Sequence, residues 1–284
     1  MELHKLALAV LGGLLVALAL QGCGEKTAPA PSSASSGASE SRAGSGASGA
    51  PDSGAARRDR RGSESDEPVV TEGPPGRIVG ATIFEGTPPA RRELAIGSTV
   101  GCEHASPPLS EAVLVEDGRL LNVFVYITKG VDAAQVPPAP SEPHVIEQTG
   151  CIYRPRMSGA RAGQPVHVRN GDGVAHNVHV KSTRNGEPNS AQPAGSAAIE
   201  LAFERPEVPV KLVCDYHPWM VAYIGVVEHP YFAVSTAAGF EIDGVPPGRY
   251  TLTAWHEDPK IKMQREEIVV PPGGEVEVDF TFSR

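Results

Sequence analysis

The chain has 284 residues, 40% of them hydrophobic, and a formal net charge of −9 at pH 7. Nucleic-acid-binding proteins rely on basic surfaces that neutralise phosphates, so this charge argues against a nucleic-acid partner. The sequence also carries no P-loop, no dinucleotide-binding fingerprint and no zinc-protease helix motif, and it therefore gives no support to those enzyme classes.

The first 22 residues have the pattern of a secretory signal. A weakly basic start at His4 and Lys5 precedes an apolar run over residues 6–20, which is too short to span a membrane comfortably but suits a signal core. The run ends in L-Q-G-C, which resembles the lipobox of bacterial lipoproteins. This resemblance implies a signal peptide at 1–22 and a lipid on Cys23, hence an extracytoplasmic protein anchored to a bacterial membrane, in the periplasm or at the outer membrane or cell surface. The alternative is an ordinary signal peptide followed by a chance cysteine.

Residues 23–75 are dominated by Ala, Ser, Gly and Pro. Such a composition buries too little apolar surface to offset the entropy lost on ordering. We therefore expect a disordered, flexible linker that tethers the folded part of the chain. The basic cluster at residues 57–61 is interpreted as part of the solvated linker rather than as a contact to an anionic surface.

From Gly76 to Arg284, short alternating or apolar stretches are separated by turns rich in Pro and Gly. This pattern predicts strands, and no stretch has the period of an amphipathic helix of useful length. The sequence therefore predicts an all-β fold built from sandwiches. The expected strands cover residues 77–85, 119–128, 164–169, 174–181, 196–203, 208–214 and 221–228.

The stretch with the most chemical content is V-P-V-K-L-V-C-D-Y-H-P-W-M at residues 208–220. It begins as a strand in which every second residue is expected to face the core, and Cys214 is the last residue of that inward-facing set. A tight loop follows, in which His217 comes three residues after the cysteine and Met220 three residues later. Thiolate, imidazole and thioether form a soft ligand set, which suits a copper ion that alternates between two oxidation states.

A further ligand is supplied by the strand at residues 174–181, V-A-H-N-V-H-V-K. His176 shares the apolar parity of Val178 and Val180, whereas His179 lies on the opposite, more polar face. A thiolate and two imidazoles with a weak axial thioether is the arrangement of blue-copper electron-transfer sites. The alternative is a buried free cysteine beside an ordinary core histidine.

The H-N-V strand and the C-x2-H-x2-M loop together resemble the type 1 copper proteins, the cupredoxins, and the short ligand loop is most similar to that of the amicyanins. The resemblance implies a Greek-key β-sandwich over residues 76–228 that holds one type 1 copper. Carried over, the ligands are His176, Cys214, His217 and Met220, and Asn177 ties the two ligand-bearing segments together by hydrogen bonds.

The resemblance also implies a non-enzymatic electron carrier that docks redox protein partners. In cupredoxins the loop histidine emerges through an apolar surface patch, to which Pro218 and Trp219 would contribute here. The sequence lacks the H-x-H pair of a trinuclear oxidase centre and the second loop cysteine of a binuclear copper site. It also lacks the C-x-x-C-H motif of covalent haem attachment.

Two of the four cysteines are left without a role by these motifs, Cys102 and Cys151. In the oxidising compartment that a secretory signal implies, a leftover pair is most simply a disulfide. The rival is a second metal site that uses both cysteines and His104.

Residues 229–284 resemble the carboxypeptidase regulatory-like, transthyretin-like (prealbumin-like) β-sandwich modules. The marker is G-V-P-P-G-R-Y-T-L at residues 244–252, where a Pro/Gly turn leads into an alternating strand. Because the segment is short for a free-standing sandwich, we expect it to borrow a strand, with residues 77–85 as the candidate. Such modules are structural or binding units, and His256 is expected at a surface or interface rather than among ligands.

Two functions remain open from the sequence. The first is an electron carrier with a type 1 copper site. The second is a copper-handling, copper-sensing or adhesion-type lipoprotein that binds the metal or a partner without physiological electron transfer. The first is favoured because a combined thiolate and thioether site suits fixed redox cycling better than metal release.

Overall fold

A computed structural model describes residues 72–97 and 99–284. The expected signal peptide at 1–22, the lipidated Cys23 and all but the last four residues of the 23–75 linker lie outside the described residues. In the described part the secondary structure is β-strand, apart from a single 3-10 turn, η1 (Ala133–Gln135). The predicted all-β fold is therefore confirmed. None of the helical structure described here has the length and hydrophobicity needed to cross a bilayer.

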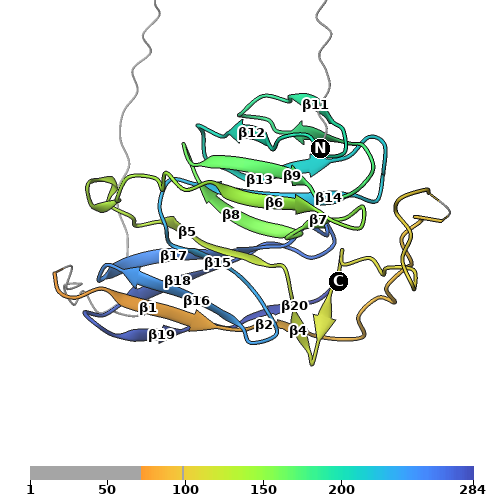
Figure 1. Cartoon of the computed structure of the whole chain (residues 1–284). Helices are drawn as coiled ribbons and strands as arrows, with labels where there is room; N and C mark the ends of the chain where they lie inside the picture. Colours follow the sequence, from red (N-terminus) through yellow and green to blue (C-terminus); the bar gives the residue numbers. More distant parts are fainter. Residues whose placement is uncertain (1–71, 98) are drawn as a thin grey trace, which may run out of the picture. The chain divides into compact units, whose positions relative to one another are not determined.

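One group of strands, here called the central sandwich, comes from a continuous stretch of chain (Figure 1). Its two sheets have the strand orders β11-β10-β13-β14-β8 and β12-β9-β6-β7. The strands are β6 (His144–Gln148), β7 (Tyr153–Arg154), β8 (Met157–Arg161), β9 (Pro165–Asn170), β10 (His176–Lys181), β11 (Asn189–Gln192), β12 (Ile199–Ala202), β13 (Glu207–Val213) and β14 (Val221–Val227).

A second group, the flanking sandwich, combines early and late parts of the chain, so orange and yellow strands lie beside blue ones in Figure 1. Its sheets have the orders β15-β5-β17-β18, β16-β1-β19 and β20-β2-β4-β3. The early strands are β1 (Gly76–Gly80), β2 (Thr82–Phe84), β3 (Val115–Glu116), β4 (Arg119–Leu120) and β5 (Phe124–Lys129). The late strands are β15 (Phe232–Val234), β16 (Phe240–Val245), β17 (Gly248–Trp255), β18 (Gln264–Val270), β19 (Glu275–Glu277) and β20 (Phe280–Phe282).

The strand pairing corrects the expected domain boundaries of 76–228 and 229–284. Strand β1 pairs with β16 and β19, β2 pairs with β20, and β5 pairs with β15 and β17. The expectation that residues 77–85 pair with the C-terminal strands is thus confirmed, and strands β3, β4 and β5 belong to the same sheets. The physical reason is that strand periodicity reveals which residues face a core but not which strand lies alongside.

Strand parity in the central sandwich follows the sequence pattern. In β10, Val178 and Val180 are buried, and in β13, Val210 and Leu212 are buried. These side chains pack in one core with residues of the opposite sheet, such as Ile146 of β6. Because alternate residues of a strand share a face, His176 at the start of β10 and Cys214 just after β13 also point into this core.

The two sandwiches meet around Phe124 of β5. Its ring lies so close to Gly225 of β14 that a Cβ added there would be 2.2 Å from ring atom Cε1. Gly159 of β8 is covered in the same way by Phe124 and Phe232. Beside this contact, Arg156 pairs with Glu257 through two hydrogen bonds, one of them 2.7 Å from Nη2 to Oε2. The junction therefore combines close aromatic packing with a mostly buried ion pair.

Candidate metal centre

The candidate ligands gather at one end of the five-stranded sheet. Strands β10 and β13 are antiparallel neighbours, with His179 opposite Val213 and Lys181 opposite Lys211. This register places the start of β10 beside the loop that follows β13. His176 at the first position of β10 is thereby brought next to Cys214, which immediately follows β13.

Three of the sequence-predicted ligands converge there. Nδ1 of His176 lies 2.9 Å from Nδ1 of His217, and Sγ of Cys214 lies 3.6 Å from the same His217 nitrogen. One ligand atom from each residue falls within 4.8 Å of the others. The exposed fractions are 0% for His176, 2% for Cys214 and 6% for His217, so the donors are withdrawn from bulk water.

The hydrogen bonds around these residues turn Nδ1 of His176 towards His217. Nε2 of His176 lies 2.9 Å from Oδ2 of Asp172, and an ionised carboxylate can only accept, so Nε2 is the donor there and Nδ1 can accept from Nδ1 of His217, 2.9 Å away. The backbone N–H of Asn177 points at the Cys214 sulfur, 3.5 Å away. A soft cation bound by two imidazole nitrogens and a thiolate fits this donor set, and copper is the metal that it suits best.

Asp172 is a functional candidate that the sequence reasoning missed. Besides contacting His176, its carboxylate accepts hydrogen bonds from the backbone N–H groups of Gly150 (2.6 Å) and Cys151 (2.9 Å). A carboxylate behind a ligating histidine fixes the tautomer and the ring orientation. The available signal was an acidic residue four positions before His176, in the turn N-G-D-G that leads into β10.

Asn177 joins the two ligand-bearing segments, as the sequence predicts. Its Oδ1 accepts from the backbone N–H of Asp215 at 2.6 Å, and its Nδ2 donates to the Asp215 carboxylate at 3.0 Å. His179, on the outward face of β10, contacts the same carboxylate at 2.9 Å and takes no part in the cluster. The strand and the loop are therefore bound together directly beside the donors.

Met220 closes the ligand loop. Its backbone N–H donates to the carbonyl of His217 at 2.8 Å, and its carbonyl accepts from the N–H of Cys214 at 3.3 Å. Its side chain is fully buried in the core cluster that also contains Cys214. The axial thioether role of Met220 stays a prediction.

Cys102 and Cys151 form a disulfide with a Cα–Cα distance of 5.5 Å. The bridge lies against the centre, with Sγ of Cys102 3.7 Å from Nε2 of His217. Trp219 covers the same region, and its Nε1 donates to the carbonyl of Cys151 at 2.9 Å. The expectation that His217 emerges through a surface patch is therefore wrong: the disulfide and the indole cover the ring, while the neighbouring Pro218 remains exposed.

Burial lowers the pKa of His217, the nearby His176 ring lowers it further, and the Asp172 charge partly opposes both effects. The lowered pKa favours the neutral ring, which retains the lone pair that a metal ligand needs.

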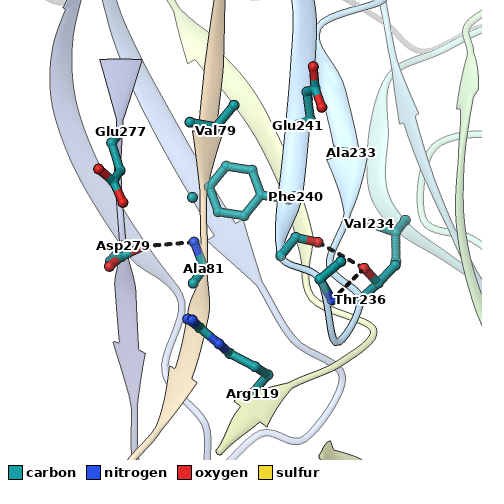
Figure 2. Close-up of a pocket in the computed structure, with 13 residues that line it drawn as sticks. Val79, Ala81, Arg119, Ala233, Val234, Thr236, Phe240, Glu241, Glu277 and Asp279 are labelled. Atoms are coloured by element: carbon teal, nitrogen blue, oxygen red, sulfur yellow. Dashed lines mark hydrogen bonds between the residues drawn. The ribbon is translucent and has the colours of Figure 1, made fainter. Parts of the chain in front are cut away.

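The described residues also form an open hollow of about 580 Å³ in the flanking sandwich, shown in Figure 2. Two of its polar groups are engaged within the protein: Asp279 accepts from the backbone N–H of Ala81, and the hydroxyl of Thr236 bonds to its own turn. By contrast, every group of three His, Cys, Asp or Glu ligand atoms found in the described part of the chain lies around His176, His217 and the disulfide. The chemistry is therefore concentrated at the centre and not in the hollow.

No known protein family matches the sequence, and no curated protein matches it. Among solved structures, the chain is similar to a purple cupredoxin from Nitrosopumilus maritimus, with 27% identity over 29% of this chain and 98% of that one, at a TM-score of 0.25. It is also similar to a reduced amicyanin mutant (21% identity, 36% of this chain, 97% of that one, TM-score 0.27). A Cu(I) amicyanin mutant gives 20% identity over the same shares at a TM-score of 0.28. With scores this low, the assignment of the site depends on its own geometry.

Proposed function

We propose that this chain is an extracytoplasmic copper-binding electron-transfer protein whose single type 1 site uses His176, Cys214, His217 and Met220. The observation that carries the proposal is the convergence of two imidazole Nδ1 atoms and one cysteine sulfur at a buried point. Such a set of one sulfur and two nitrogens is typical of blue-copper centres.

Bound copper would supply a one-electron couple, since one of its oxidation states favours sulfur and the other accepts nitrogen. The contribution of the chain is to hold the donors. Cys214 gives up its proton when the metal binds, and the N–H of Asn177 steadies the resulting thiolate. His176 is held by Asp172, and Met220 is held by the backbone hydrogen bonds that close the loop.

Rigid donors favour electron transfer because little rearrangement then accompanies a change in oxidation state. The three converging donors are all at least nine-tenths buried, and Asn177 ties their two segments to each other. Deep burial also keeps substrates away from the metal, while an electron needs no open channel. These features favour an electron carrier over an enzyme.

The proposal includes redox protein partners and attachment to a bacterial membrane through a lipid on Cys23. The support for the anchor is the L-Q-G-C sequence at the end of the apolar segment. The Ala/Ser/Gly-rich stretch that follows has the composition of a flexible linker, which would let a lipid-anchored carrier reach its partners.

The test is an optical and paramagnetic-resonance spectrum of the full chain loaded with one equivalent of Cu(II). We expect intense visible absorption from a copper–thiolate bond. A His179→Gln variant, altered on the outward face of the same strand, should keep that absorption. A colourless copper-loaded protein would overturn the proposal. Voltammetry then separates the carrier, which gives a reversible one-electron wave, from a copper-storing or copper-sensing lipoprotein, which gives none.

A further inference from the structure

We infer that reduction of the Cys102–Cys151 disulfide creates a second soft-metal site, formed by the two cysteine thiolates and Nε2 of His217. The site would share the His217 imidazole with the first centre, and the inference in that respect rests on the proposed function. Its ligand class is a thiophilic monovalent cation, namely Cu(I).

The geometry of His217 provides the shared ligand. Its Nδ1 faces His176 and Cys214, at 2.9 Å and 3.6 Å. Its Nε2 faces the other way, 3.7 Å from Sγ of Cys102. The ligand atoms of Cys102, Cys151 and His217 all lie within 4.8 Å of one another. A metal at each nitrogen would therefore be separated by the width of one imidazole ring.

The chemical step balances with a dithiol reductant. Two electrons break the S–S bond, each sulfur takes up one proton, and the dithiol becomes a disulfide. Cu(I) then displaces the two thiol protons and, when the first copper already occupies Nδ1, the Nε2 proton of His217. All three protons go to solvent. The second ion is held by two thiolates and one nitrogen of the ring, which becomes an imidazolate bridging the two metals. Soft thiolate donors select Cu(I), and low coordination numbers suit this ion.

The surroundings favour a cation at this position. The Asp172 carboxylate accepts a hydrogen bond of 2.9 Å from the backbone N–H of Cys151, the residue that carries one of the two sulfurs. Cys151, Asp172 and His176 form a further group with ligand atoms within 4.8 Å. A buried carboxylate near the thiolates lowers the cost of placing a positive ion beside them.

The residues that flank Cys102 lie at the surface. Cys102 is buried, yet its neighbours Gly101, Glu103 and His104 are exposed. Besides the disulfide, the segment contacts the Cys151 turn through a 2.7 Å hydrogen bond between His104 Nε2 and the carbonyl of Gly150, and Gly101 packs against Val174. A reductant can therefore reach the bridge by displacing one short segment. The metal would replace the disulfide as the cross-link that holds the segment in place.

The experiment is an anaerobic Cu(I) titration of the full chain against a chromogenic Cu(I) chelator. All samples carry Cys23→Ser, so the thiol groups come from Cys102, Cys151 and Cys214 alone. We expect one tightly bound copper in the oxidised protein and two after reduction with a trialkylphosphine, which takes an oxygen from water as it is oxidised. The double variant Cys102→Ser/Cys151→Ser should bind one copper under both conditions.

The outcomes separate this inference from the proposed function. One copper in both redox states would overturn the second site and leave the first intact. No copper in the oxidised protein and one in the reduced protein would contradict the first centre and support the second. A Cys214→Ser variant should bind none when oxidised and one when reduced. Because the main comparison uses one protein in two redox states, it does not depend on the folding of any variant at Cys102, Cys151 or Cys214.

Discussion

The central and flanking sandwiches bury polar groups in different ways. In the flanking sandwich, the buried hydroxyls of Thr82 and Ser235 both donate to the backbone carbonyl of Leu120. In the central sandwich, His176, His217 and Cys214 are similarly buried, but their nitrogen and sulfur atoms contact one another. Burial alone therefore does not identify a site. The site is identified by several buried ligand atoms lying close enough together to bind one ion.

The two regions also differ in how the chain assembles them. Strands β5 and β15 are antiparallel neighbours in one sheet of the flanking sandwich, with Phe124 opposite Val234. All nine strands of the central sandwich lie between them in sequence. The candidate metal-binding unit is thus inserted between two paired strands of a scaffold assembled from distant segments.

The largest expected effect is confined to the central sandwich. Replacing Cys214 by Ser removes the sulfur that defines the centre, so the copper–thiolate absorption should vanish completely. The metal-free variant should unfold close to the wild type, because Ser is nearly isosteric and the N–H of Asn177 still meets an oxygen. Visible spectroscopy and thermal unfolding check both statements. Residual intense absorption would mean that the chromophore lies elsewhere.

The next effect concerns the junction of the two sandwiches. Glu257→Gln leaves the mostly buried Arg156 guanidinium without its counter-charge. Removing one partner of a buried pair typically costs about 3–5 kcal/mol. The matched change Glu241→Gln, in the exposed pair with Arg77, should cost far less, because solvent screens that pair. Denaturant unfolding measures both, and equal costs would show that the junction pair carries no special weight.

A pH effect of similar size is expected from the flanking sandwich. Burial lowers the pKa of His256 from 6.5 to about 4, while the nearby Asp258 opposes the shift. The folded state therefore prefers the neutral ring, and its stability is complete above pH 6.5 and is lost as the pH falls towards 4. Linkage gives about 3 kcal/mol for the whole interval.

The measurement is the free energy of unfolding of the metal-free protein between pH 7 and pH 4. A His256→Asn variant retains an acceptor for the N–H of Asp258 and should show a shallower loss. His144 and His229 also have pKa values lowered by burial and supply part of the remaining slope. An identical slope in the variant would contradict the assignment to His256.

The smallest of these effects tests Asp172. Asp172→Asn weakens the contact that fixes the His176 ring, and changes of this kind typically lower metal affinity about 10–100-fold. The exposed Asp243 on β16 provides the control, because Asp243→Asn removes the same charge from the flanking sandwich. Competition titration with a copper chelator measures both affinities. Equal losses would indicate an effect of overall charge and not of ring positioning.

The sequence predicted the inward position of His176 and Cys214 because strand parity is a local property: each residue's side depends only on counting along the strand. It predicted the joining role of Asn177 from a resemblance. It did not predict that Asp172 faces His176, since that contact depends on how the turn before β10 folds back. Nor did it predict that the disulfide lies against His217, because the spacing of two cysteines does not say what they cover.

What the sequence by itself determined is the strand content, the face on which each strand residue lies and the spacing of the ligand loop. These follow from local alternation and from turn residues. Tertiary structure alone decided that strands β1–β5 join the C-terminal strands, that β10 lies beside β13 in the register that brings the ligand residues together, and that His217 is covered. Those outcomes depend on which strands bury one another's apolar faces, and that is a property of the whole chain, which no local pattern encodes.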